Sequence, residues 1–336
     1  MAHLKLSPRR IVQSGFLLLV AILGVQFYRF VEQFSNPGSS EPVVAHPSGV
    51  EAFLPIGGLT SLKYFLSTGE IHPLHPASFF IFIAALGVSA VLSKSFCSWI
   101  CPVGFFSELL YQPWKRRFSK NLQLPRWMDW GLRSIKYLVL LFFVWAIGVA
   151  MSPEQTLDFL NSDYWKVADV KMLYFFTRMS GTALLVITTI VLLSIPVRMF
   201  WCRFLCPYGA LLGIVGRLSP FRIRRDPDRC NGCQKCTRNC PSHLPVSKSK
   251  AVKSVECSSC LTCQVGCPRG ALSYSTPSVI QKHALGLNAR NSALTTLGVF
   301  FAIILIAKLT GNWRSQVSPH DLSRLIPQLD NLGHPR

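Results

Sequence analysis

The sequence is poor in charge, and above all in acidic residues. Charged residues make up 15% of the 336 positions, and only 15 Asp and Glu stand against 35 Lys and Arg, for a net charge of +20. A soluble domain usually carries about 25% charged residues. Half of this chain is hydrophobic, in long runs separated by basic loops, which is typical of a membrane protein. Contact with membrane lipid therefore explains the apolar runs, and basic cytoplasmic loops explain the positive net charge, so we expect no nucleic-acid partner.

Several cofactor motifs are missing. The chain contains no Cys-x-x-Cys-His sequence, no Gly-x-Gly-x-x-Gly sequence and no Walker sequence, and none of its eight histidines falls inside a predicted span. These absences argue against an attached c-type haem, a nucleotide or nicotinamide site, and a b-type haem between membrane helices. We therefore expect no organic substrate to be transformed by such a cofactor.

Five apolar segments are long enough, allowing for tilt, to cross a bilayer. They lie near residues 11–31, 77–92, 134–151, 182–197 and 292–309. The first has a basic start and no small-x-small site close behind it, so we expect an uncleaved anchor. The expected fold is an all-α membrane bundle of about five transmembrane helices with a small α+β insert. Its divisions are a membrane domain at 1–227, the insert at 228–275, and the fifth span with an outer tail at 276–336.

The charges of the loops predict the orientation. Residues 198–291 hold fifteen Lys and Arg against three acidic residues, whereas residues 32–76 hold one against four. Because basic loops stay in the cytoplasm, we expect the N-terminus, loop 93–133 and the insert to be cytoplasmic and the C-terminus to lie outside a bacterial inner membrane. All 12 cysteines then face the cytoplasm, where thiols stay reduced and favour metal binding over disulfides.

The strongest motif is a repeated cysteine spacing. Cys-x-x-Cys-x-x-Cys-x-x-x-Cys-Pro begins at Cys230 and again at Cys257, which is the spacing of two-cluster bacterial ferredoxins. In that motif the fourth ligand comes from the other half. We therefore predict two [4Fe-4S] clusters, with the ligand sets Cys230, Cys233, Cys236 and Cys267 for one, and Cys240, Cys257, Cys260 and Cys263 for the other. Zinc is the alternative, although zinc sites do not require this doubled pattern.

A second pair of cysteine motifs follows two of the predicted spans. The pattern aromatic-Cys-x-x-x-Cys-Pro-x-Gly occurs at 96–104 and again at 201–209. The membrane part therefore resembles a duplication. If the repeats face each other, four thiolates meet at the cytoplasmic membrane surface, namely Cys97, Cys101, Cys202 and Cys206. They would suit a third iron–sulfur cluster, zinc or Cu(I). The alternative is a pair of helix-capping motifs with inert thiols.

The loop at 32–76 offers a candidate quinol site. Residues 52–66 are apolar and are expected to lie in the membrane interface. Glu51, His72 and His75 could accept the protons that quinol oxidation releases. The alternative is that the two His-Pro pairs simply turn the chain into the next helix.

Together these motifs resemble a family of membrane ferredoxins. It includes the quinol-dehydrogenase subunit of periplasmic nitrate reductase and the C-terminal half of the nitrous-oxide-reductase regulator. The resemblance covers about residues 50–271 and rests on the order Cys-x-x-x-Cys-Pro, two spans, Cys-x-x-x-Cys-Pro, and the ferredoxin pair. It implies electron transfer between the quinone pool, cytoplasmic donors and periplasmic reductases. The chain departs from these relatives in its fifth span and in having no flavin-type domain before the first span.

We therefore expect an electron-transfer component of an oxidoreductase complex, and whether the chain is itself an enzyme stays open. It would relay electrons between a quinone pool or cytoplasmic carrier and a periplasmic or membrane redox partner. The alternatives are a factor that reduces or assembles copper for a respiratory enzyme, and a redox-sensing regulator. The basic insert, with twelve net positive charges over 198–291, would dock an acidic carrier or contact anionic lipid.

Overall fold

The structure is a computed structural model, and it describes residues 7–34, 44–118, 124–277 and 286–332. Its packing divides the chain into two compact units. Unit 1 comprises residues 1–17, 85–140 and 187–300, and unit 2 comprises residues 18–84, 141–186 and 301–336. All five boundaries between the units fall inside helices. The domain boundaries expected at 228 and 275 stay a prediction.

Three helices are long and apolar enough to cross a membrane: α1 (Pro8–Glu32), α7 (Arg126–Trp145) with the π-helical turn that extends it to Ala150, and α15 (Ala289–Leu309). They coincide with three of the expected spans. The other two expected spans correspond to the shorter apolar helices α3 (Pro76–Leu92) and α11 (Gly181–Ser194). α11 qualifies only together with α10 (Ala168–Thr177), from which it is bent by 75°. Within the described residues the structure thus shows three candidate spans, or four with the bent pair, and the total of five stays a prediction.

The outward faces of these helices are apolar. Leu138 on α7 and Leu185 on α11 are more than 60% exposed, and so is Leu18 on α1. Exposed apolar surface of this extent is unfavourable in water and is covered by lipid in a membrane protein. The chain is therefore a mostly helical membrane protein.

Unit 1 adds short elements between the long helices. The helices are α4 (Phe96–Trp99), α5 (Pro102–Leu110), α6 (Gln112–Phe118), α12 (Pro207–Val215), α13 (Lys235–Arg238) and α14 (Thr262–Val265). The strands are β1 (Arg222–Arg225), β2 (Leu272–Ser275) and β3 (Gly286–Leu287), which form an antiparallel sheet in the order β1-β2-β3.

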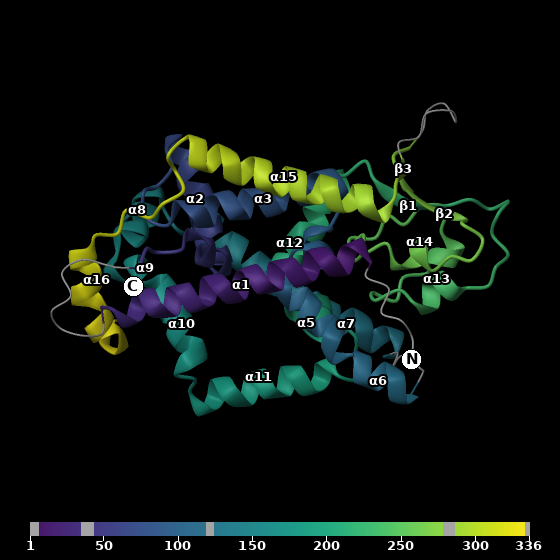
Figure 1. Cartoon of the computed structure of the whole chain (residues 1–336), viewed down its shortest axis with the longest axis horizontal. Coiled ribbons are helices and arrows are strands. Elements are labelled where there is room, and N and C mark those ends of the chain that lie inside the picture. The colour runs from purple at the N-terminus through teal and green to yellow at the C-terminus, as the bar shows by residue number, and fades with distance from the viewer. Residues whose placement is uncertain (1–6, 35–43, 119–123, 278–285, 333–336) are drawn as a thin grey trace. The chain divides into compact units, whose positions relative to one another are not determined.

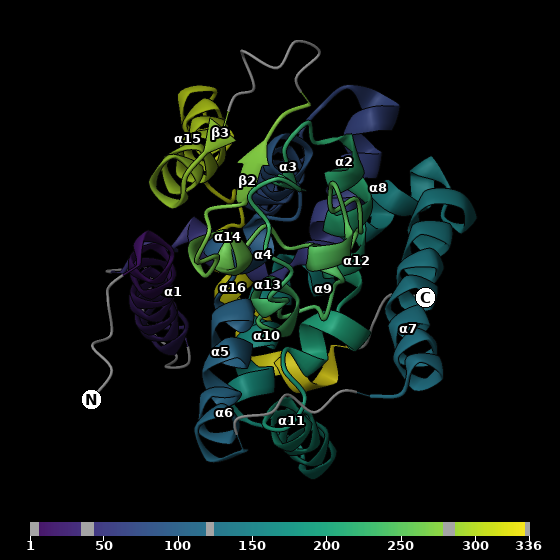
Figure 2. The same cartoon turned by 90° about the vertical axis from the view of Figure 1, so that its right-hand side faces the viewer.

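The sheet joins the two ends of the cysteine-rich insert. Ile223 pairs with Tyr274, and both side chains are buried. Because β1 precedes the eight ferredoxin-type cysteines and β2 follows them, their pairing closes this segment into one compact body. α13 and α14 lie beside this sheet (Figure 1, Figure 2).

Unit 2 holds the remaining helices. They are α2 (Pro55–Thr68), α8 (Pro153–Asn161), α9 (Asp163–Lys166), α10 and α16 (Pro319–Leu325). A core of aromatic residues near the end of α1, among them Phe27 and Phe30, packs with Val170 of α10 and Leu322 of α16. The C-terminal segment expected to be an outer tail is therefore folded and packed over most of its described length. Much of the expected interfacial stretch at 52–66 is the helix α2.

Candidate functional site

The eight ferredoxin-type cysteines line two cavities in unit 1. One cavity is lined by Cys230, Cys233, Cys236 and Cys267, and the other by Cys240, Cys257, Cys260 and Cys263. Each encloses about 360 Å³ of space free of atoms, its opening included, which is the share of about a dozen waters. These two groups are the two predicted ligand sets, with the fourth cysteine exchanged between the halves. Ligation by the eight thiols stays a prediction.

The two cysteine-rich halves also repeat in the backbone. Three positions in each half have a positive φ, and they correspond pairwise in the repeat: Gly232 with Ser259, Gln234 with Leu261, and His243 with Gly270. A left-handed conformation costs a non-glycine residue roughly 1–2 kcal/mol, so such conformations persist where the site requires them. In the first pair, the positive φ accompanies a hydrogen bond to a cysteine sulfur. The N–H of Gly232 donates to the sulfur of Cys230, and the N–H of Ser259 donates to that of Cys257.

The two cavities differ in their surroundings. Cys233 in the first cavity is exposed, and Arg225, Lys235 and Arg269 lie around it. Cys240 and Cys263 in the second cavity are buried, and burial raises the pKa of Cys257 to about 12. A thiol with such a pKa loses its proton only when a metal replaces it. The first cavity therefore has an exposed cysteine and basic neighbours, while the cysteines of the second are more buried.

The two Cys-x-x-x-Cys-Pro motifs adopt the same wide turn. The N–H of Cys101 donates to the carbonyl of Phe96 at 3.1 Å, and the N–H of Cys206 donates to that of Trp201 at 3.0 Å. These bonds span five residues, a π-type geometry that often marks functional sites. The proline that follows each motif then begins the next helix, α5 or α12. Proline is favoured at this position because the N–H that it lacks would have no partner within the helix.

The four cysteines of these motifs are close to one another. The pKa of Cys202 is raised by burial and, to a smaller extent, by the charges of Cys101, Cys206 and Cys97. Burial likewise raises the pKa of Cys97 to about 12 and that of Cys101 to about 11. The mutual effects on pKa show that the four thiols lie near one another, and metal binding by them stays a prediction. Within the described residues, no three His, Cys, Asp or Glu side chains are arranged to bind a single metal ion.

This four-cysteine site touches the loop of the second cavity. The hydroxyl of Ser98 donates to the carbonyl of Ser258 at 2.6 Å, and the indole N–H of Trp99 donates to the carbonyl of Ser259 at 3.1 Å. The Trp99 side chain is 1% exposed. The two cysteine-bearing loops are therefore in direct contact, with the indole packed where they meet.

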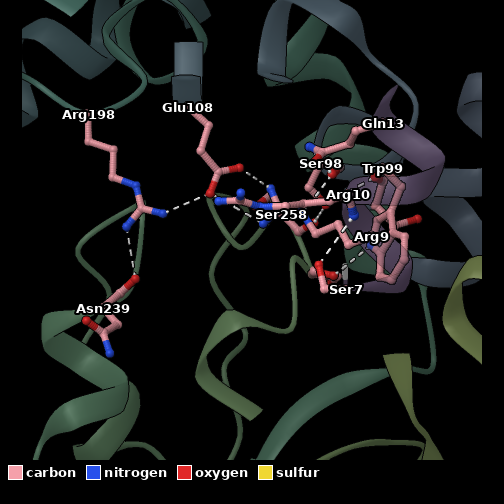
Figure 3. Close-up of polar contacts among 12 residues, drawn as sticks. Ser7, Arg9, Arg10, Gln13, Ser98, Trp99, Glu108, Arg198, Asn239 and Ser258 are labelled. Carbon is pink, nitrogen blue, oxygen red and sulfur yellow. Dashed lines mark hydrogen bonds and ion pairs between the residues drawn. The ribbon is translucent and has the colours of Figure 1, made fainter. Parts of the chain in front are cut away.

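A buried carboxylate holds the surrounding segments together (Figure 3). Glu108 on α5 pairs with Arg9 at 2.6 Å and with Arg198 at 3.2 Å. Arg198 also donates to the carbonyl of Asn239, next to Cys240, and Arg9 donates to the carbonyl of Ser98. Burial alone would raise the pKa of Glu108, but its two arginines hold it below the ordinary value. Glu108 thus connects both Cys-x-x-x-Cys-Pro regions to the ferredoxin insert.

A second buried ion pair joins α7 to the insert. Lys136 is fully buried and pairs with Glu256 at 2.6 Å, while the hydroxyl of Tyr137 donates to the other carboxylate oxygen at 2.7 Å. Sequence analysis missed these residues and Glu108. Lys136 did leave a signal, because a lysine inside a predicted span usually serves a function.

The three candidate quinol residues lie in unit 2. Nδ1 of His75 is 3.3 Å from a carboxylate oxygen of Glu51, and Nε2 of His75 is 2.9 Å from the carbonyl of Trp165. The other oxygen of Glu51 accepts from the N–H of Ser78 at 2.9 Å. His72 contacts Asn161 at 3.2 Å. The structure therefore pairs Glu51 with His75 and gives His72 a different partner.

Sequence analysis missed a second buried pair beside them. His46 lies 2.7 Å from Asp169. Burial alone would lower the pKa of His75, but the charges of Asp169 and Glu51 outweigh it and raise that pKa to about 9. By contrast, burial lowers the pKa of His72. Glu51, His75 and Asp169, which are buried, form one ionisable cluster with His46, whose side chain is 19% exposed.

Comparison with known proteins agrees with the cysteine motifs. The model of a 4Fe-4S binding domain matches residues 74–121 and 179–226, and that of a 4Fe-4S dicluster domain matches residues 222–279. The protein named "Putative electron transport protein YccM" of Escherichia coli (strain K12) is 41% identical over 328 residues, which cover 97% of this chain and 91% of the relative. The chain belongs to the membrane-bound [4Fe-4S] ferredoxin-type family.

Other members of the family match over a smaller part of the chain. "Ferredoxin-type protein NapH" of Haemophilus influenzae is 29% identical over 58% of this chain and 65% of the relative. "Regulatory protein NosR" of Pseudomonas aeruginosa is 29% identical over 51% of this chain and 23% of the relative. No solved structure matches the chain. Both the domains and the relatives make it an iron–sulfur electron-transfer protein of the membrane.

Proposed function

We propose that the chain relays electrons through three iron–sulfur sites, between a quinone pool or cytoplasmic donor and a partner redox enzyme. Two sites are the cavities of the insert, and the third is the four-cysteine site, where the thiols of Cys97, Cys101, Cys202 and Cys206 would hold a further [4Fe-4S] cluster. The chain lies in the bacterial inner membrane with the N-terminus and the insert on the cytoplasmic side.

The contact between the cysteine-bearing loops carries this proposal. Ser98 lies between the two cysteines of its motif, and it bonds directly to Ser258, which lies between Cys257 and Cys260. Ser259 of the same loop bonds to Trp99. The loop that carries Cys97 and Cys101 therefore contacts the loop that carries Cys257 and Cys260, which supports an electron path between the two sites.

The residues around the sites perform distinct tasks. The cysteines give up their protons as metal binds, and backbone N–H groups such as that of Ser259 stabilise the resulting thiolate charge. An iron–sulfur cluster, when bound, supplies one-electron redox chemistry whose potential depends on these hydrogen bonds and on exposure to solvent. Because Cys233 in the first cavity is exposed, whereas Cys240 and Cys263 in the second are buried, electrons would exchange with a soluble carrier at the first.

The test is the metal content of the purified protein. Protein prepared anaerobically in detergent is analysed for iron and acid-labile sulfide, with electron paramagnetic resonance (EPR) after dithionite reduction. We expect about twelve irons per chain, and about eight in the Cys97→Ser variant that also carries Cys202→Ser. As a matched control, Cys230→Ser with Cys233→Ser removes the first ferredoxin cluster and leaves the other signals.

Other results would redirect the assignment. Eight irons in the wild type, with copper bound and lost in the first double variant, would favour the copper-handling alternative. Zinc without iron would refute the electron relay altogether.

We also propose that quinol is oxidised beside Glu51, His72 and His75. The support is the buried Glu51–His75 pair together with His72: the Glu51 carboxylate and the imidazole of His72, whose pKa burial lowers, can take up the protons that quinol releases. Quinol-dependent reduction of the clusters should be lost in the His72→Ala, His75→Ala double variant and kept in the control His320→Ala, whose side chain is exposed. Full activity in the double variant would reject the site.

An acidic electron carrier is the expected cytoplasmic partner. Arg225, Lys235 and Arg269 surround the first cavity, and opposite charges accelerate the encounter of two proteins. The rate of reduction by an acidic ferredoxin should therefore fall as ionic strength rises. A rate independent of salt would argue against electrostatic docking and leave anionic lipid as the partner of the basic surface.

A further inference from the structure

Lys94 is a buried lysine that the proposed relay does not use. It follows the end of α3 and precedes the first cysteine motif, and its side chain is 5% exposed. A lysine is almost never this buried unless a negative charge compensates it.

The ammonium of Lys94 faces the four-cysteine site. A Cβ atom added to Gly209 would lie 3.6 Å from Nζ of Lys94 and also 3.6 Å from the sulfur of Cys206, so both atoms border one small space. The positive charge of Lys94 also lowers the pKa values of Cys97 and Cys202, against the larger effect of burial.

Within the described part of the chain, Lys94 belongs to none of the close ion pairs, which in this region join Lys136 to Glu256 and Arg198 to Glu108. Glu256 is the nearby candidate, and the charge of Lys94 helps to lower its pKa. Each of its carboxylate oxygens already accepts a hydrogen bond, one from Lys136 and the other from Tyr137. Two buried lysines, Lys94 and Lys136, thus share the single carboxylate of Glu256, which leaves one positive charge beside the four cysteines.

We propose that Lys94 is the charge-compensating residue of the four-cysteine site, and that its ammonium raises the reduction potential of the cluster bound there. This inference rests on the proposed third cluster. A cube held by four thiolates carries a net negative charge, and each added electron increases it. A buried cation beside the sulfurs stabilises the reduced form more than the oxidised form.

The position of Lys94 gives the effect a direction along the relay. The lysine faces the four cysteines rather than the first cavity, so its removal should affect the membrane-side site most. Lowering that one potential would make the site a poorer electron acceptor, whether the electrons come from the membrane or from the insert.

The test compares Lys94→Met, which removes the charge, with Lys94→Arg, which keeps it. Redox titration of the full-length protein in detergent, followed by EPR, measures each midpoint potential, and the iron content shows whether all sites are filled. In Lys94→Met we expect the third cluster to bind its electron about tenfold more weakly, a shift of about 59 mV for a one-electron couple. Lys94→Arg should stay close to the wild type.

Each outcome separates this inference from the proposed function. Twelve irons in both variants with unchanged potentials, or an equal shift of all three clusters, would overturn the role of Lys94 alone. Twelve irons in Lys94→Arg and eight in Lys94→Met would support the role of Lys94, because the positive charge would then be needed to hold the cluster. The retained ferredoxin signals would show that the protein has folded. Eight irons in the wild type would overturn both.

Discussion

Truncation of Glu108 tests whether the buried ionic contacts hold the cluster-bearing segments in place. In the Glu108→Ala variant, Arg9 and Arg198 lose their shared carboxylate while both remain largely buried, with side-chain exposures of 13% and 9%. Removal of one partner from a buried ion pair costs about 3–5 kcal/mol. Because these side chains keep some contact with solvent, we expect about 3 kcal/mol, which is roughly a hundredfold change in the unfolding equilibrium.

The assay is reversible unfolding in mixed detergent micelles, followed by tryptophan fluorescence and by the visible absorbance of the clusters. Arg198 also bonds to the carbonyl of Asn239, beside Cys240, so the absorbance of the second ferredoxin cluster should be lost first. Glu70→Ala, which truncates an exposed glutamate, is the matched control. If Glu108→Ala unfolds within about 0.5 kcal/mol of this control, the ionic contacts do not hold the segments.

Two further predictions concern packing and pH. A methyl group at Gly104 would lie 2.3 Å from the carbonyl oxygen of Cys97, so the Gly104→Ala variant should lose about four irons and keep the ferredoxin signals. The control is Gly148→Ala, which should lose no iron because the space around Gly148 is open. Equal iron contents in the two variants would disprove this prediction. The raised pKa of His75 stabilises the fold below its unfolded value of 6.5, and this contribution is lost as the pH rises towards about 9. The free energy of unfolding should therefore fall by up to about 3 kcal/mol over that range. The His75→Gln variant should show a flatter dependence of this free energy on pH. A pH profile parallel to that of the wild type would contradict the prediction.

The cysteine spacing predicts which cysteines line each of the two cavities, because it reflects a local requirement. A short loop can wrap three thiols around a cube but cannot supply the fourth, and the exchange of Cys240 and Cys267 follows from this. Both Cys-x-x-x-Cys-Pro motifs were found for a similar reason, since the spacing, the proline and the glycine all serve one turn. Hydropathy placed the long helices α1, α7 and α15 because lipid contact constrains whole runs of residues.

Contacts between distant segments left no such pattern. Glu108 binds Arg9 and Arg198, which are far apart along the chain, and neither arginine has a sequence context that differs from an ordinary basic loop. Lys94 was counted only as one more basic loop charge. The short helices were also hard to predict, because α11 acts together with α10 across a sharp bend rather than as one continuous apolar run.

The exchanged cysteines have a consequence for biosynthesis. A nascent chain that has emerged as far as residue 250 already exposes Cys230, Cys233 and Cys236, yet the cavity they line also needs Cys267. The other cavity needs Cys263. Neither cavity is therefore complete until almost the whole insert has left the ribosome, and both are then completed nearly together. A product that terminates before Cys263 would expose cysteines with no finished site to receive iron.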